Sequence, residues 1–80
     1  MTKIQIIDQL ENKILDFTEL LIDYNNTRLP MVHNGGAWNA LETKVAKLKT
    51  KIDGYWDAVD IVNAMSPNDP NMQLFAEEAK

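Results

Sequence analysis

The chain has 80 residues, no cysteine and a formal net charge of −4 at pH 7. This length allows one domain at most, and the absence of cysteine excludes disulfides, thiolate nucleophiles and cysteine-ligated zinc. The negative charge argues against a general attraction to nucleic-acid phosphates. No apolar run approaches the ~20 residues that a membrane span requires, and the N-terminus lacks the layout of a signal peptide. We therefore expect a cytoplasmic protein without a membrane segment.

A first helix is predicted over about residues 3–25. Thr2 and Gln5 have the spacing of a capping box at its start. Asn25 and Asn26 can end it, because asparagine tolerates the left-handed conformation that closes many helices. Apolar residues recur along this segment at alternating steps of three and four, which places them on one side of a helix. They are Ile7, Leu10, Ile14, Phe17, Leu21 and Tyr24.

A second helix is predicted over about residues 37–65, after a loop over 26–36 that contains Leu29-Pro30 and Asn34-Gly35. This helix has a series of apolar residues with the same spacing, and we call each of the two series an apolar ladder. The second ladder consists of Trp38, Leu41, Val45, Leu48, Ile52, Tyr55, Val59 and Val62. Gly54 costs about 1 kcal/mol inside a helix relative to alanine. The ladder nevertheless passes Gly54 without losing phase, which favours one continuous helix.

A short third helix is predicted over about residues 70–79. Asp69-Pro70 supplies an N-cap followed by proline at the first helical position. One side of this helix carries Met72, Phe75, Ala76 and Ala79. The sequence as a whole predicts a single all-α domain, residues 1–80, built as a long antiparallel helical hairpin with a coiled-coil-like seam plus a short C-terminal helix.

The two ladders also suggest a register for the hairpin. We expect Phe17 opposite Val45 and Ile7 opposite Tyr55, so that Val62 and Met65 extend beyond the start of the first helix. Several apolar residues then point away from the seam, namely Leu15, Ile22 and Ile61. The C-terminal segment with Met72, Leu74 and Phe75 can cover some of this surface. Because a short hairpin needs further core, we expect homodimerisation or another form of self-association to cover the rest, and the alternative is burial against a different protein.

The predicted loop is longer than the 2–8 residues that usually join helices in bundles, which suggests a purpose. It contains Arg28, Leu29, Pro30 and Met31, and Trp38 follows it. Arginine, methionine and aromatic residues are enriched in protein-binding hot spots. We therefore predict a non-enzymatic protein–protein interaction module, an inhibitor or regulator of the phage or plasmid accessory type. Its partner-binding residues would be these five, followed by Trp56. The alternative, which can coexist with binding, is that Leu29, Met31 and Val32 form a lid over the hairpin end.

The runner-up function is nucleic-acid binding by Lys44, Lys47 and Lys51, which follow one edge of the second helix. No aromatic residues are interleaved with these lysines, so the sequence ranks it below protein binding. An enzyme is not expected, because His33 and Ser66 have no third group that would make them a catalytic set. We predict no metal and no cofactor, since the sequence offers one histidine and no cysteine as ligands.

Overall fold

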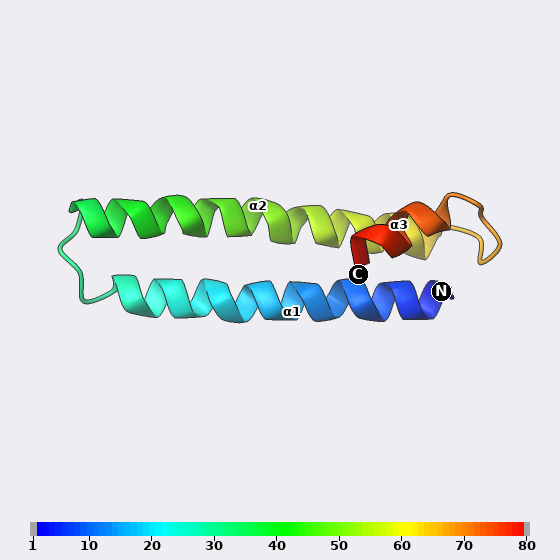
Figure 1. Ribbon diagram of the computed structural model, residues 1–80, viewed down its shortest axis with the longest axis horizontal. Helices are drawn as coiled ribbons and strands as arrows, with labels where there is room; N and C mark the ends of the chain where they lie inside the picture. Colours follow the sequence, from blue (N-terminus) through cyan, green and yellow to red (C-terminus); the bar gives the residue numbers. More distant parts are fainter. Residues whose placement is uncertain (1, 80) are drawn as a thin grey trace.

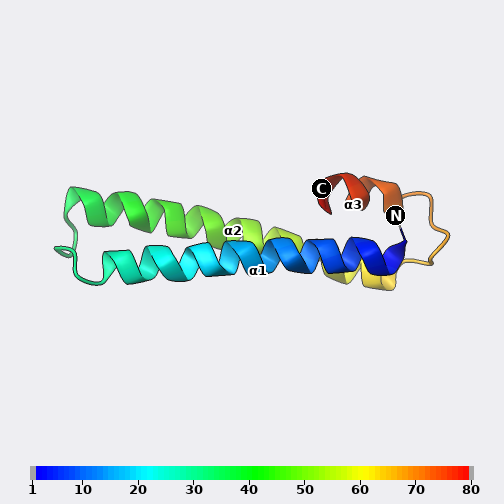
Figure 2. The same ribbon diagram turned by 60° about the horizontal axis from the view of Figure 1, so that its bottom comes forward.

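The computed structural model describes residues 2–79 and contains three helices (Figure 1). They are α1 (Lys3–Arg28), α2 (Gly36–Ala64) and α3 (Met72–Ala79). Helices α1 and α2 form an antiparallel hairpin, and α3 folds back over the end of the hairpin where the chain begins (Figures 1 and 2). The molecule is a rod with extents of 52 × 17 × 15 Å. The predicted all-α hairpin with a short C-terminal helix is confirmed.

Helix α1 begins at the predicted capping box and ends later than predicted. The Gln5 backbone N–H donates to Thr2 Oγ1 at 3.2 Å, and the Thr2 N–H donates to Gln5 Oε1 at 2.9 Å. Asn25 and Asn26 do not end the helix, which continues to Arg28 with Leu29 as a right-handed C-cap. Pro30 follows directly, and its ring and missing N–H are incompatible with further helix.

Helix α2 passes through Gly54 without a break, as predicted. Its last turn is capped by the start of α1, because Lys3 Nζ donates to the backbone oxygens of Asn63 and Met65, each at 2.9 Å. A cation at a helix C-terminus satisfies free carbonyls and complements the negative end of the helix dipole. Lys3 therefore joins the two helix ends at the base of the hairpin.

The predicted register is wrong by about one heptad. The Phe17 ring stacks on the Tyr55 ring with centroids 5.7 Å apart, and its centroid lies 4.7 Å from Lys51 Nζ. The predicted pairing placed Phe17 opposite Val45, which precedes Lys51 by six residues and Tyr55 by ten. Val62 is fully buried rather than extending beyond α1. A slide of seven residues keeps the same apolar sides together, so the ladders could not distinguish the two registers.

The seam residues themselves were predicted correctly, since every member of both ladders is buried or half-buried. The core is concentrated beneath α3, whose predicted apolar side packs on the hairpin. This cluster consists of Ile6, Leu10, Ile14, Ala58, Val59, Val62, Met72, Ala76 and Ala79. Towards the loop, Val45 is the one buried apolar residue among residues 2–79 that lies outside the cluster. The loop-end half of the hairpin therefore has two layers where the other half has three.

Several large apolar side chains are exposed. Leu15, Ile22 and Ile61 point away from the seam as predicted, and the C-terminal segment does not cover them. Leu74 is itself 67% exposed, on the outer side of α3. Across the described residues, none of the helices has the combined length and apolar character of a membrane span.

Candidate functional site at the loop end of the hairpin

The loop between α1 and α2 covers residues 29–35 and is closed by its own backbone. Met31 N–H donates to the oxygen of Arg28 at 2.9 Å, and Gly35 N–H donates to that of Val32 at 3.0 Å. Asn34 has the left-handed φ of 61° that asparagine tolerates. A Cβ on Gly35 would lie 3.1 Å from the Val32 oxygen, which favours glycine there. This loop is shorter than the predicted 26–36 because α1 continues to Arg28.

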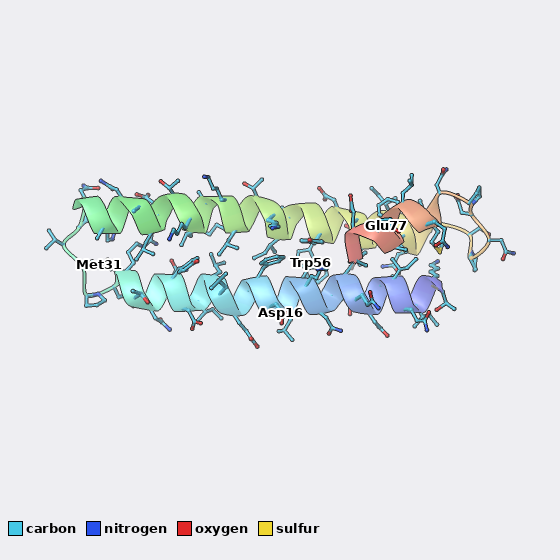
Figure 3. All side chains as sticks on the ribbon, in the orientation of Figure 1. Asp16, Met31, Trp56 and Glu77 are labelled. Atoms are coloured by element: carbon cyan, nitrogen blue, oxygen red, sulfur yellow. The ribbon has the colours of Figure 1, made fainter. Side chains whose placement is uncertain are left out.

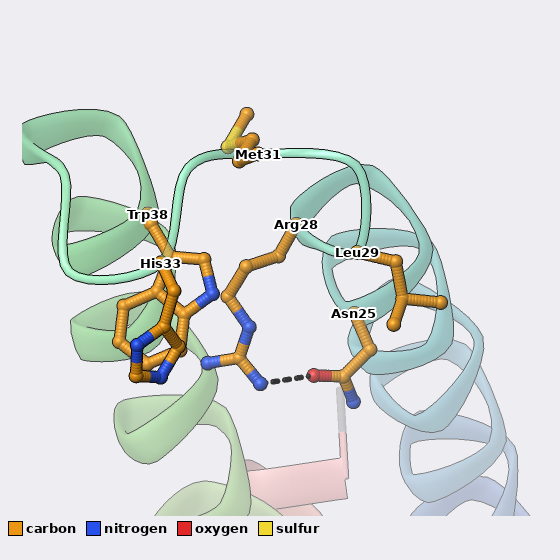
Figure 4. A pocket seen from close by; sticks show the side chains of 6 residues that line it. All are labelled: Asn25, Arg28, Leu29, Met31, His33 and Trp38. Atoms are coloured by element: carbon orange, nitrogen blue, oxygen red, sulfur yellow. Dashed lines mark hydrogen bonds between the residues drawn. The ribbon is translucent and has the colours of Figure 1, made fainter.

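A pocket of about 410 Å³ opens beside this loop (Figure 4). We call it the loop-end pocket. It is lined by Asn25, Arg28, Leu29, Met31, His33 and Trp38. The last turn of α1, the loop and the first turn of α2 all contribute, so the pocket exists only when the hairpin is closed.

Arg28 and Trp38 form the centre of the pocket. The Arg28 guanidinium lies 4.9 Å from the Trp38 ring centroid, and Arg28 Nη2 donates to Asn25 Oδ1 at 2.9 Å. The centroids of the His33 and Trp38 rings lie 4.4 Å apart, and the two ring planes are tilted by 59°. Figure 4 shows the guanidinium between these two rings and the Asn25 amide. An arginine stacked on tryptophan is held in place while its remaining N–H groups stay able to donate.

Arg28 has no carboxylate partner among residues 2–79. Its polar partner is the neutral amide of Asn25, and its charge lies over an aromatic ring. The pocket therefore combines a positioned cation with apolar walls formed by Leu29 and Met31. Such a site suits a carboxylate with an apolar group next to it, because guanidinium N–H groups match carboxylate oxygens in geometry and charge.

The structure brings together four of the residues that the sequence predicted for partner binding, namely Arg28, Leu29, Met31 and Trp38. Pro30 is exposed on the same loop but does not line the pocket. Trp56 lies 18 residues beyond Trp38 in α2, or roughly 27 Å away, near the middle of the molecule and far from Met31 (Figure 3). Trp56 is therefore separate from this site.

Sequence reasoning missed Asn25 and His33 as pocket residues. Asn25 was predicted to end the helix, although its place three residues before Arg28 is a spacing at which helical side chains meet. His33 carries no comparable signal, because the fold of the loop decides where its ring lies. The predicted lid is wrong for Leu29 and Val32, which are 81% and 80% exposed. Both contribute apolar surface at the loop end instead.

Lys44, Lys47 and Lys51, which we call the lysine edge, lie outside the loop-end pocket. Lys51 Nζ lies 4.7 Å from the Phe17 ring centroid, and Lys44 Nζ lies 5.9 Å from that of Tyr24. Their aliphatic stems thus cover the seam while the ammonium groups stay at the surface. Lys47 is exposed and has no aromatic ring beneath it among residues 2–79.

A second cavity, of about 380 Å³, lies between α2 and the end of α3, lined by Lys51, Gly54, Tyr55 and Glu78. It contains charges of both signs and lies away from His33. Ser66 belongs to the turn that follows α2, at the other end of the rod from His33. The structure therefore does not bring these two residues together.

Comparisons of this chain with protein-family models, with curated proteins and with solved structures find no match. Inference about function therefore depends on the geometry of the chain's own residues.

Proposed function

We propose that this protein is a non-enzymatic protein-interaction module whose loop-end pocket binds an acidic segment of a partner protein. The observation that carries the proposal is Arg28, a half-buried cation stacked on Trp38 without a carboxylate partner among the described residues. A carboxylate from a partner would supply the negative charge that Arg28 lacks nearby. Its oxygens would accept hydrogen bonds from the remaining guanidinium N–H groups.

The surroundings of Arg28 support this interpretation. Arginine and tryptophan are the residue types that most often dominate binding energy at protein interfaces. The loop also exposes Leu29 and Val32 almost completely, and burying these side chains against a partner would add favourable apolar contact around the charge. A rod with this site at one end suits a small inhibitor or regulator that acts by occupying a surface of its target.

The proposal can be tested by affinity capture with three immobilised baits. They are the wild-type chain, Arg28→Gln and Lys47→Gln, each incubated with extract from the source cells. We expect at least one protein to be retained by the wild type and by Lys47→Gln but lost with Arg28→Gln, as judged by quantitative mass spectrometry. Equal retention by all three baits would contradict a role for the pocket.

Nucleic-acid binding by Lys44, Lys47 and Lys51 is the second candidate. Two of these ammonium groups lie over aromatic rings of α1, which gives them a role in covering the seam. We therefore rank this function below protein binding, and its test is given in the Discussion.

A further inference from the structure

Helix α3 covers one side of the hairpin at the end where the chain begins, and that side continues beyond the end of α3 towards the loop (Figures 1 and 2). Ile6 of α1 and Ala58 of α2 belong to the buried cluster beneath α3. A heptad returns an α-helix to nearly the same side, so residues one and two heptads from these two, towards the loop, continue the side that α3 covers. We call these residues the open side, and they are Lys13 and Leu20 in α1 and Lys51 and Lys44 in α2.

The two flanks of the open side carry opposite charges. The lysine edge follows the flank on α2, and all of its lysines are exposed. On α1, Leu20 is 37% exposed and lies between two pairs of helical neighbours. The pair on the seam side is Phe17 and Tyr24, and the pair on the outer side is Asp16 and Asp23, which are both exposed. The open side is therefore basic along α2, apolar at Leu20 and acidic along the outer flank of α1.

Helix α3 shows how a helix packs on this side of the hairpin. Its buried residues Met72, Ala76 and Ala79 join the core cluster, and its Glu78 lines a cavity together with Lys51 of α2. An acidic side chain of α3 thus lies towards the lysine edge while the apolar side of α3 covers the seam. In the loop-end half, which α3 does not reach, the hairpin has two helical layers.

We propose that the open side binds an amphipathic helix of a partner protein, which lies in line with α3 and directs a row of carboxylates towards the lysine edge. The distance from Lys51, beside the end of α3, to the start of α2 at Gly36 is about 22 Å, which fits a helix of about four turns. None of the lysines of the edge forms an ion pair among residues 2–79, so they can bind partner carboxylates. Other residues line the loop-end pocket, so the two sites are separate.

The charge pattern favours a protein helix over nucleic acid. A phosphate backbone is negative on every side and would meet Asp16 and Asp23 when it reached the lysine edge, and like charges at an interface oppose binding. A helix can carry carboxylates along one flank and neutral or basic residues along the other, which matches both flanks of the open side. Apolar side chains between its two flanks would pack on Leu20.

Fluorescence anisotropy with a stapled helical peptide tests the proposal. The probe is about four turns long, with leucine on one side, glutamate along one flank and glutamine elsewhere. Because a helix can turn end for end, this probe can direct its glutamates towards α2 in either direction. The control peptides have glutamine or lysine in place of the glutamates. We expect the acidic probe to bind saturably and at least about tenfold more tightly than either control peptide.

Variants of the protein identify the surface that binds the probe. The test variants are Lys51→Glu and Lys44→Glu. The matched control is Lys49→Glu, because Lys49 is also exposed and its charge changes equally, but it lies about 160° round α2 from Lys51. We expect each test variant to weaken binding of the acidic probe at least about tenfold, and the control to change it by less than about twofold. Circular dichroism verifies that the variants are folded.

Amide chemical shifts of the labelled wild type locate the bound probe. We expect changes at Leu20 and Lys44 and none at Leu15 and Ile22, which lie about 140–160° round α1 from Leu20. Changes confined to Leu15 and Ile22 would overturn the proposal, as would equal losses of affinity with Lys51→Glu and Lys49→Glu. Absence of binding at a probe concentration of about 1 mM would also overturn it. Binding of a labelled DNA duplex through Lys51, without binding of the acidic probe, would overturn it in favour of nucleic acid.

Discussion

The Arg28 guanidinium lies 4.9 Å from the centre of the Trp38 ring, so the last residue of α1 is stacked on the first turn of α2. This contact closes the loop end of the hairpin, and it also forms the centre of the loop-end pocket. The same two residues therefore link the stability of the hairpin end to the proposed binding site.

Replacing Arg28 by Gln should lower the free energy of unfolding by about 1 kcal/mol, because it removes the contact with Trp38 and the hydrogen bond to Asn25. Urea denaturation followed by circular dichroism measures the change. Lys47→Gln is the control, and we expect it to stay within about 0.5 kcal/mol of the wild type, as surface changes usually do. An Arg28 variant as stable as this control would mean that the stacking contributes nothing to the fold.

The uneven core predicts that equal truncations will have unequal effects along α1. Leu10→Ala removes a fully buried side chain beneath α3 and should cost about 2–5 kcal/mol. Leu21→Ala, in the loop-end half, removes a half-buried side chain and should cost about half as much or less, since less apolar area is lost. Chemical denaturation of both variants makes the comparison. Equal losses would indicate that the loop-end half is packed as tightly as the rest.

Replacing Gly54 by Ala should stabilise the protein by about 0.5–1 kcal/mol, because glycine is a poor helix former. A Cβ at this position meets nothing within 4 Å, so the added methyl group introduces no clash. For a domain of this size the gain corresponds to a rise in Tm of roughly 2–8 °C, which calorimetry can measure. A fall in Tm would show that the cavity beside Gly54 closes in solution.

Lys3 should matter for stability despite its place near the start of the chain. Its ammonium group donates to the Asn63 and Met65 oxygens, so Lys3→Met should cost about 1 kcal/mol. Thermal denaturation checks this value, and hydrogen exchange should quicken in the last turn of α2. Lys13→Met serves as the control, because Lys13 has no such contact with α2 among the described residues. Unchanged exchange at the end of α2 would contradict the capping role.

The lysine edge gives a test that separates the two candidate functions. We expect the triple variant with Gln at Lys44, Lys47 and Lys51 to retain protein capture by the loop-end pocket. Fluorescence anisotropy with a labelled single-stranded and a duplex oligonucleotide should show no binding that depends on these lysines. If the wild type bound either probe with affinity falling steeply as salt rises, and the triple variant did not, the nucleic-acid function would gain support.

Much of the fold was predictable because its determinants are local. The capping box at Thr2, the passage of α2 through Gly54 and the apolar side of α3 all depend on residues a few positions apart. Helical periodicity likewise identified the seam residues. The site was predictable in part, since the composition around Arg28 and Trp38 is typical of interfaces, but Asn25 and His33 join it through the path of the loop.

What the sequence by itself determined was therefore the set of helices and the sides on which they pack. Only the tertiary structure decided the register and the placement of α3 over Ile6 and Val62. The physical reason is that ladders of similar apolar side chains pair almost equally well after a slide of one heptad. Contacts between distant residues, such as Lys3 with Met65 and Phe17 with Tyr55, distinguish one register from the next.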